Sequence, residues 1–583
     1  MRSIFVVSWR TRQRSGGAGV AREFMPRFLS DSPSVSMLLP FITRRARWDS
    51  EHSLLWRIPF VTLVGWLVGV SILAGVAPGW GSSMGIRIDV KDEHQVIHSF
   101  GASDCWTCQF VGKNWPIEKR NAIADLLFST ATDSSGNPKG IGLSMWRVNI
   151  GAGSAEQGDA SKIGSRWHRA ECFLNADGTY DWTKQQGEQW FAKAAKARGV
   201  RYLLGFTNSP PVQYTLNGIA HADPGRTAFN IRPDALPKFA DFLAEVAAHF
   251  DKAGIPFDYI SPINEPQHAW DTDKQEASPA NNAEVFEVTR LVGKALHDRG
   301  LPAKVAIAEA GSIDYLAYAR GHNRASDQVK EFWDPSSPHY IGSVPNVARV
   351  ISGHSYFTTW PISAQIEARE RLRKRVEQID PRLAFWQSEF CILESNDETT
   401  GGGGRDLGMN TALYVARVIH SDLTIADATQ WSWWLGVSGH DFKDSLVYLD
   451  KLGGASSDPD PLRSDGTVVP SKLLWAMGNF SRFVRPGMVR VGATYDDHRS
   501  PADAASTVMA SAYLDKKTKR LAIVLINVTK EDQVVKLSGA NFRGKTVDSY
   551  TTSASSDLAK GSTSPCEVRV PARSVVTVVG AAR

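Results

Sequence analysis

The sequence has little of what redox, metal and nucleic-acid sites are built from. Its 583 residues include only five cysteines (105, 108, 172, 391 and 566), an odd and sparse set that does not make a disulfide scaffold. Cys105 and Cys108 have no second pair at zinc spacing, so buried thiols or one local disulfide are the simpler interpretation. No RNA-binding signature, zinc-finger spacing or internal repeat is present. We therefore expect no nucleic-acid partner, no metal and no cofactor.

The chain is also nearly neutral outside its N-terminal region. The formal net charge is +5, but residues 1–57 hold ten arginines and four acids. The rest of the chain carries 56 basic and 57 acidic residues, so its net charge is −1. The basic pI therefore gives no argument for nucleic-acid binding. Tryptophan is abundant, with 19 residues, which suits a protein that stacks flat ligands such as sugars, although core packing is the simpler use.

One long apolar run, Ile58 to Val76, follows Arg57 and precedes a stretch of small residues. A basic region, an apolar core and small residues, in that order, are typical of a secretory signal. Nineteen apolar residues could also span a bilayer as an anchor. We expect residues 1–84 to be a leader with a signal peptide or anchor. The body is then secreted or periplasmic, or membrane-anchored and facing outward if the segment is not cleaved.

From residue 98 to residue 485, short apolar runs alternate with longer helical patterns. One such helical pattern covers residues 236–254, where Gly254 should end the helix, and another covers residues 362–379. Eight strand-then-helix units predict an α/β fold, a (β/α)8 TIM barrel with long loops. The predicted strands cover residues 98–104, 142–151, 201–211, 258–267, 304–312, 350–357, 383–393 and 428–436.

Residues 486–583 have a different pattern, with β-type runs separated by turns. They predict an appended all-β side domain, a β-sandwich. Residues 85–97 contain an early strand with no helix after it, and we expect them to join that domain. The glycine run at 401–404 lies in the loop after the seventh barrel strand, and we expect it to be mobile.

Polar residues end the predicted barrel strands, and two of them are glutamates. Glu265 ends the fourth strand and Glu389 the seventh. The active site of a TIM barrel lies at the C-terminal ends of its strands, so both carboxyls should reach one mouth. Two carboxyls roughly 5–5.5 Å apart are what a retaining glycosidase needs. Glu309 also ends a strand but lacks the flanking pattern, and we interpret it as a supporting residue.

The order of motifs along residues 86–583 resembles glycoside hydrolase family 30 of clan A. The resemblance rests on NEP with a later SEF, on GHSYF and on LWAMGNFSRFVRPG. Within the family, the segments at 104–120, 169–182 and 206–218 look most like the subfamily 5 endo-β-1,6-galactanases.

The resemblance implies a role for each residue of the catalytic centre. Glu265 would be the acid/base and Glu389 the nucleophile. Arg147 would pair with Glu389 and keep it ionised, Tyr356 would donate a hydrogen bond to it, and His354 would orient its neighbours. Glu265 is expected to hold the proton at the start of each cycle.

It also implies residues that bind the sugar. Asn264 would bond the 2-hydroxyl of the sugar being cleaved, and Asp104 and Asn208 would bind other hydroxyls. Trp433, with Trp431 on the same strand face, would form an apolar platform under the sugar.

The leading functional hypothesis is a retaining endo-β-1,6-galactanase that acts on a polysaccharide or oligosaccharide, and we expect it to be a monomer. Other specificities of the family stay open: β-1,6-glucanase, glucosylceramidase-like β-glucosidase or glucuronoxylanase. So does a non-catalytic carbohydrate-binding surface protein. The glycine-rich segment at 395–408 could reshape the subsites, so endo and exo action also stay open.

Overall fold

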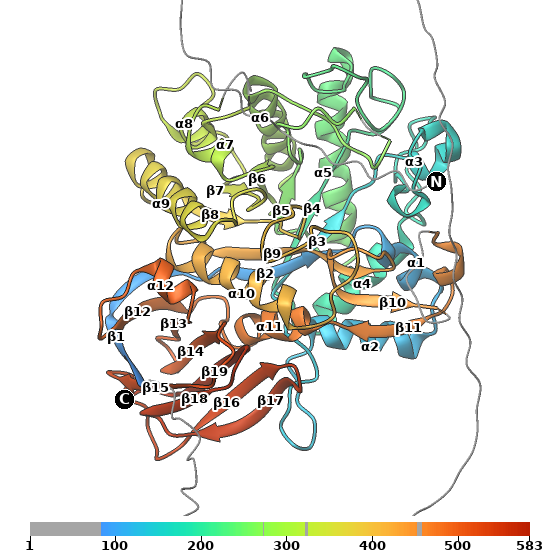
Figure 1. The fold of residues 1–583 in the computed structure, drawn as a ribbon. Coiled ribbons are helices and arrows are strands. Elements are labelled where there is room, and N and C mark those ends of the chain that lie inside the picture. The colour runs from blue at the N-terminus through green and yellow to red at the C-terminus, as the bar shows by residue number, and fades with distance from the viewer. Residues whose placement is uncertain (1–82, 272, 321–324, 452–457) are drawn as a thin grey trace, which may run out of the picture. The chain divides into compact units, whose positions relative to one another are not determined.

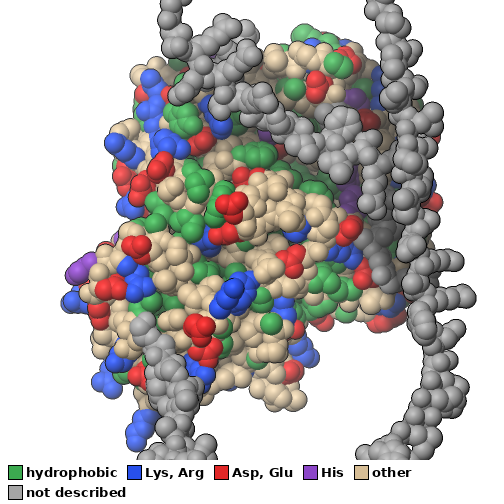
Figure 2. Space-filling model, in the orientation of Figure 1, with side chains coloured by type: hydrophobic (Ala, Val, Ile, Leu, Met, Phe, Trp, Pro, Cys, Tyr) green, Lys and Arg blue, Asp and Glu red, His purple; other side chains and the backbone are tan. Residues whose placement is uncertain are grey.

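The structure is a computed structural model that describes residues 83–271, 273–320, 325–451 and 458–583. The apolar run at 58–76, and with it nearly all of the expected leader, lies outside these ranges. Within them, no helix combines the length and the hydropathy needed to cross a bilayer. Positive, negative and apolar side chains are interspersed on the face shown in Figure 2, as the near-neutral charge of the body predicts.

In the described part of the chain, eight parallel strands close into a barrel (Figure 1). They follow one another in chain order from β2 to β9, and β9 pairs with both β8 and β2 to close the ring. Each strand falls on one of the eight predicted runs, so the TIM-barrel prediction is confirmed. The strands are β2 Ser99–Ser103, β3 Met145–Asn149, β4 Tyr202–Phe206, β5 Tyr259–Ser261, β6 Lys304–Ala310, β7 Val347–Gly353, β8 Ala384–Gln387 and β9 Gln430–Ser438.

Helices connect the barrel strands and end where the sequence provides a cap. The helix α5 stops two residues before Gly254, whose backbone is left-handed with φ of 75°. Asn281 begins α6 with a capping box to Glu284. The helices are α1 Thr107–Asn114, α2 Ile117–Phe128, α3 Ser154–Gln157, α4 Gln186–Ala197, α5 Leu236–Lys252, α6 Asn282–Asp298, α7 Asp314–Ala317, α8 Gln328–Trp333, α9 Ile362–Ile379 and α10 Met409–Thr424.

Two short strands that the sequence did not indicate extend the barrel sheet outward. The strand β10 (Ser445–Asp450) runs parallel to β9, and β11 (Thr467–Pro470) pairs with it in the antiparallel sense. They lie between the last barrel strand and the helix α11 (Lys472–Ser481).

The remaining strands form a separate all-β domain around its own apolar core. Within the described residues nine strands make one sheet, in which β18 also contacts β14, β17 and β19, none of them its neighbour in the sheet. The sheet is therefore folded over its core in two layers. Its members are β1 Ser83–Val96, β12 Val489–Tyr495, β13 Val508–Leu514, β14 Arg520–Asn527, β15 Gln533–Ser538, β16 Val547–Ser553, β17 Ser556–Thr563, β18 Glu567–Val570 and β19 Ser574–Ala581, and the short helix α12 (Pro501–Ala505) precedes β13.

The β domain joins the barrel through α11. A Cβ at Gly478 of this helix would lie 2.5 Å from Leu558 and 2.8 Å from Ile141, so only glycine fits between the two domains. Asn479 donates hydrogen bonds to the Tyr550 carbonyl and the Thr577 hydroxyl. The early strand β1 pairs with β12 and β15 and so belongs to this domain.

The glycine run at 401–404 is anchored, contrary to the expectation of a mobile loop. The buried Lys443 ammonium donates to the carbonyls of Gly401 and Gly403, both at 2.8 Å. A Cβ at Gly402 would overlap the Phe442 ring. The glycines therefore allow the loop to approach Lys443 and Phe442, which lie about forty residues further along the chain.

Candidate active site

Glu265 and Glu389 meet at the C-terminal mouth of the barrel. Glu265 follows β5 and Glu389 follows β8, and their exposed fractions are 6% and 4%. Glu265 has a left-handed backbone with φ of 47°, and its amide donates to the Glu309 carbonyl at 2.8 Å. The backbone of an acidic residue is held in an unfavoured conformation, which is common where function fixes a side chain.

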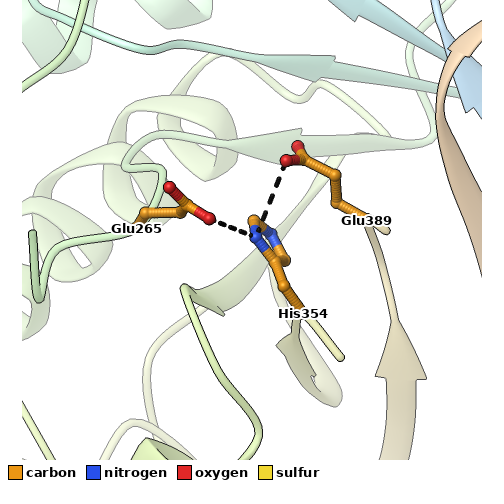
Figure 3. A group of neighbouring side chains, drawn as sticks. All are labelled: Glu265, His354 and Glu389. Carbon is orange, nitrogen blue, oxygen red and sulfur yellow. Dashed lines mark hydrogen bonds and ion pairs between the residues drawn. The ribbon is translucent and has the colours of Figure 1, made fainter. Parts of the chain in front are cut away.

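His354 lies between the two glutamates (Figure 3). Its Nδ1 is 2.8 Å from Glu265 Oε1 and 3.7 Å from Glu389 Oε1, and its Nε2 is 3.1 Å from Glu309 Oε2. One side-chain atom from each of Glu265, His354 and Glu389 lies within 4.8 Å of the other two. The two carboxyl groups therefore face one small space.

Glu389 is held by two further donors. Arg147, fully buried on β3, donates to Glu389 Oε2 at 3.0 Å and with its other terminal nitrogen to Glu309 Oε2 at 3.2 Å. The Tyr356 hydroxyl donates to Glu389 Oε1 at 3.0 Å. Arg147 and Tyr356 thus make the contacts that the resemblance implied. Glu309 bridges Arg147 and His354, which fits a supporting residue.

Burial and five neighbouring ionisable side chains set the charges at the mouth: three carboxyls surround the Arg147 guanidinium and the His354 imidazole. Burial favours neutral His354, but Glu389 and the hydrogen bonds to Glu265 and Glu309 outweigh it and raise the pKa of His354 to about 10. Burial likewise opposes ionisation of Glu309, but Arg147 and His354 lower the pKa of Glu309 to about 2. An imidazolium, a guanidinium and one carboxylate are therefore fixed charges at neutral pH.

In the unliganded site the pKa values of Glu265 and Glu389 shift in the directions opposite to those expected. Burial raises the pKa of Glu389 above its usual value, against the opposing effects of His354 and Arg147. Burial also acts to raise the pKa of Glu265, but His268 and His354 outweigh it and leave the pKa of Glu265 lowered. Arg147 does favour ionised Glu389, as expected. His268, whose Nε2 lies 3.6 Å from Glu265 Oε2, was not among the predicted site residues.

The spacing of Glu265, His354 and Glu389 would also suit ligands of a metal ion. The chemistry of His354 does not. Both of its ring nitrogens face carboxylate oxygens, and the raised pKa of His354 keeps a proton on each nitrogen, so neither has a lone pair for a metal. The group fits a proton-bearing site better than a metal centre.

The predicted asparagines have polar atoms with no protein partner. Asn208 donates to Asn149 Oδ1 at 3.4 Å, while its own Oδ1 is buried and makes no hydrogen bond within the described residues. The same is true of Asn264 Oδ1. Buried polar atoms without partners are uncommon in proteins. Those at the mouth are therefore suited to hydroxyl groups of a ligand.

Asp104 joins the ends of two barrel strands. It is fully buried, and its Oδ1 accepts the amide of Asn149 at 2.8 Å, which ties the end of β2 to that of β3. Its Oδ2 is buried and, like Asn208 Oδ1 and Asn264 Oδ1, makes no hydrogen bond within the described residues. Burial raises the pKa of Asp104 well above its usual value, and its contact with a sugar stays a prediction.

Trp431 does not lie where it is expected under the sugar. Its ring lies 6.5 Å from that of Trp433, and both side chains are fully buried. The Trp433 indole nitrogen is buried and makes no hydrogen bond within the described residues, so the place of Trp433 under the sugar stays a prediction. The Trp431 indole donates to Asp422 on α10, so it faces the helix layer. The pairing of β2 with β9 shifts by one residue between Gly101↔Ser432 and Ser103↔Leu435. This bulge turns Trp434 toward the mouth instead.

Trp434 is part of a group of rings that we call the aromatic wall: Trp106, His168, Trp434 and His440. The Trp434 ring lies 6.0 Å from the Arg147 guanidinium and 5.6 Å from Trp106, and Trp106 lies 4.2 Å from His168. His440 stacks on His168 at 5.1 Å. Burial lowers the pKa of His168 to about 4 and, with His168 and Arg405, that of His440 to about 3. The wall is therefore uncharged at neutral pH.

The wall's residues come from three parts of the barrel: the loop after β2, the loop after β3, and β9 with the loop after it. Trp434 and Trp106 keep 9% and 6% of their surface exposed, and both histidines are half-buried. Flat, uncharged rings of this kind suit the apolar face of a sugar. The tryptophan excess in the sequence pointed to such a surface, but not to these residues.

The sequence model of the family described as O-Glycosyl hydrolase family 30 matches residues 83–448, which is well over half of the chain. The chain belongs to glycoside hydrolase family 30. This confirms the resemblance at the level of the family.

Individual relatives agree with the assignment. A glucuronoxylanase, XynC of Bacillus subtilis strain 168, is 31% identical over 192 residues, which are 30% of this chain and 40% of that protein. The chain thus spans about 40% of the length of the curated relatives it matches. The crystal structure of a conserved exported protein from Bacteroides fragilis is 37% identical with a TM-score of 0.80, covering 85% of this chain and 99% of that one. The catalytic domain of a family 30 xylanase C from Talaromyces cellulolyticus shares the fold, with 20% identity, a TM-score of 0.60 and coverage of 85% and 99%.

Proposed function

We propose that this protein is a retaining glycoside hydrolase that cleaves β-linked glycans, with β-1,6-galactan as its substrate. The observation that carries the proposal is the pair of carboxyls, Glu265 and Glu389, whose oxygens lie within 4.8 Å of each other around His354. This separation suits direct attack on the sugar, because an inverting enzyme needs roughly 6.5–9.5 Å between its carboxyls to admit a water.

In the first step, Glu389 attacks the anomeric carbon while Glu265 gives its proton to the leaving oxygen. Arg147 and Tyr356 keep the attacking carboxylate oriented through their hydrogen bonds to its two oxygens. A covalent glycosyl–Glu389 ester forms. In the second step, Glu265 takes a proton from water, which attacks the same carbon and releases Glu389.

This cycle needs the proton on Glu265, whereas the unliganded site favours it on Glu389. We infer that the bound sugar reverses the order. Sugar hydroxyls that donate to Glu389 favour its charged form, as any hydrogen bond to a carboxylate does. The Nδ1 of His354 lies near one oxygen of each glutamate and offers a route by which the proton can pass from Glu389 to Glu265.

The choice of β-1,6-galactan rests on sequence segments around the mouth. The segment 104–120 includes Trp106 of the aromatic wall, and the segment 169–182 directly follows His168. Both resemble the subfamily 5 endo-β-1,6-galactanases. A glucuronoxylan is the second candidate, because a curated relative is named a glucuronoxylanase and is 31% identical over 192 residues.

We further propose that the protein is exported. The order of charges and apolar residues before residue 84 is typical of a secretory signal, and the similar Bacteroides fragilis protein is described as exported. An extracellular or periplasmic location would give the enzyme access to polymeric glycans.

A release assay tests the proposal. The full chain is incubated with β-1,6-galactan, β-1,6-glucan, glucuronoxylan and a β-glucoside, with Glu389→Ala as the matched inactive control and with EDTA in a parallel series. We expect new reducing ends from β-1,6-galactan, unchanged by EDTA. Release from glucuronoxylan alone would select the second candidate, and no release from any glycan would indicate a carbohydrate-binding protein without activity.

A further inference from the structure

The turn after Glu265 folds back onto this residue. The His268 amide donates to the Glu265 carbonyl at 3.2 Å, and the Trp270 indole donates to the same oxygen at 2.9 Å. The His268 ring packs edge-on against the Trp270 ring, with the two ring centres 5.3 Å apart. The turn therefore keeps the His268 side chain beside the acid/base, although the next residue, Ala269, is exposed.

Two histidines face the two carboxylate oxygens of Glu265, and their surroundings differ. His354 Nδ1 lies 2.8 Å from Oε1, and His268 Nε2 lies 3.6 Å from Oε2, which points away from His354 in Figure 3. His354 is fully buried and also contacts Glu309 and Glu389. His268 leaves 38% of its side chain exposed, and in the described part of the chain its ion pair is with Glu265 alone. His268 is therefore placed to act on the acid/base without acting directly on the nucleophile.

Gly311 leaves the space that the His268 ring occupies. It follows β6, and a Cβ there would lie 2.6 Å from Nε2 and 3.0 Å from Cδ2 of His268. Gly311 is not one of the glycines with a left-handed backbone, so glycine is needed here for room and not for its conformational freedom. Its amide donates to Gln267 Oε1 at 3.0 Å, which joins the end of β6 to the turn that carries His268. A side chain at position 311 would displace the ring from Glu265.

The carboxyl of Glu265 benefits from a nearby cation at one moment of the cycle. As its proton passes to the leaving oxygen, a buried group becomes charged, which burial opposes. Burial acts to raise the pKa of Glu265, and Glu309 acts in the same direction, but His268 and His354 outweigh them. The half-exposed His268 ring can take a proton from solvent, and a carboxylate beside it favours that charged form. Arg147, the buried guanidinium of the site, bonds Glu309 and Glu389 instead.

We propose that His268 is a positioning residue for the acid/base: its imidazolium faces the second oxygen of Glu265 and stabilises the negative charge that this carboxyl gains as its proton passes to the leaving sugar. The inference rests on the proposed function and extends it. In this step the O–H bond of Glu265 breaks and the proton bonds to the leaving oxygen, while His268 keeps its own proton. In the second step Glu265 takes a proton from water and loses its charge, so the imidazolium gives that step no help.

Two aryl glycosides of β-1,6-galactobiose separate the two steps. A methoxyphenolate is a poor leaving group without a proton, so kcat/KM on the methoxyphenyl glycoside measures the step in which Glu265 is the acid. A dinitrophenolate leaves without a proton, so its first step is fast, and kcat on the dinitrophenyl glycoside measures the release of the sugar from Glu389. The full chain is used throughout, and the initial burst of dinitrophenolate counts the active sites.

We expect His268→Gln, which keeps a polar side chain without the charge, to lower kcat/KM on the methoxyphenyl glycoside about tenfold. The kcat on the dinitrophenyl glycoside should not fall, because the second step loses no stabilisation. Gly311→Ala should have the same effect, since it displaces the ring, and the double variant should lose no more than either single one. His297→Gln, the same substitution at an exposed position of α6, is the control with no change.

An unchanged kcat/KM in His268→Gln would overturn the inference while leaving the proposed hydrolase intact. A fall of equal size in both measured quantities would also overturn it, because it would mean that the turn only shapes the site. A wild-type rate in Gly311→Ala would do the same, because the position of the ring would then not matter. A wild-type protein that hydrolyses neither glycoside would overturn the proposed function and this inference together.

Discussion

The barrel mouth and the core of the β domain are opposite kinds of interior. A cluster of apolar side chains, with members such as Ile523 and Leu525 of β14, fills the core of the β domain, where the polar Asn527 and Thr577 are also buried. The mouth instead buries Arg147, His354 and Glu309 at zero exposure, with polar atoms that have no protein partner. The first interior is organised for stability, and the second accepts an electrostatic cost to hold charges in place for a ligand.

The sharpest way to test this contrast is to remove the nucleophile. Glu389→Ala should lower the hydrolysis rate by about 10⁴-fold or more, because no covalent intermediate forms without the carboxylate. Azide should restore part of the rate on an activated aryl glycoside by entering the vacated space. A rate within tenfold of wild type would mean that another residue is the nucleophile.

Removing the charge of Glu389 should not lower the stability of the protein. The raised pKa of Glu389 means that folding disfavours its charged form, so Glu389→Gln should melt at the wild-type temperature or above it at neutral pH. A melting temperature several degrees lower would show that the mouth contributes to stability.

The acid/base is tested by the pH profile. Glu265 and Glu389 together need one proton, so the rate should fall at low pH, where both are protonated, and at high pH, where neither is. Glu265→Gln should lower the rate on a natural glycan by roughly 10²–10⁴-fold and remove the alkaline fall for aryl substrates with good leaving groups. A rate that keeps rising into the alkaline range would contradict the pairing.

In the β domain a substitution should lower stability and leave activity unchanged, which is the reverse of what we expect at the barrel mouth. Leu525→Ala should destabilise the protein by about 2–5 kcal/mol, the usual cost of a cavity in a packed core, while kcat of the folded protein stays unchanged. Thermal or urea unfolding gives the first quantity and activity per folded molecule the second. Lys536→Ala, on an exposed position of β15, is the control that should change neither.

An effect of similar size is expected in the pH dependence of stability. Burial raises the pKa of Glu276 and of Asp444, each to about 7, and both lie in loops of the barrel mouth. Between about pH 4.5 and pH 7 the folded state keeps protons on these two carboxyls that the unfolded chain has lost, so each carboxyl lowers stability as pH rises, by on the order of 3 kcal/mol. The buried neutral His168 and His440, whose pKa values are lowered to about 4 and about 3, act in the opposite direction up to about pH 6.5, so the test is a difference between two proteins. The melting temperature of Glu276→Gln minus that of the wild type should increase from about pH 4.5 to pH 7, and a difference that stays constant or decreases would contradict the raised pKa of Glu276.

The sequence was a good guide where local pattern decides the structure. Each barrel strand is a short apolar run. Glu265 and Tyr356 come just after the ends of such runs and Arg147 lies within one, so the barrel's closure brings the three together. The helix at 362–379 was predicted at its observed bounds because its periodicity is local.

The errors arise where distant contacts decide. The family resemblance placed Trp431 beside Trp433 under the sugar, but Trp431 faces α10, and one extra residue opposite β2 turns Trp434 toward Arg147. The glycine loop depends on Lys443, which joins it only in the folded chain. The influence of His268 on the proton of Glu265 is likewise a product of the fold and not of a motif.

The stereochemistry of the first product tests the central claim most directly. Two successive displacements at one carbon, the first by Glu389 and the second by water, return the starting configuration. Proton NMR of the earliest products released from β-1,6-galactan should therefore show the β anomer, with the α anomer growing in only as the sugar mutarotates. An α anomer appearing first would contradict the account, because Glu389 would then activate water instead of attacking the sugar.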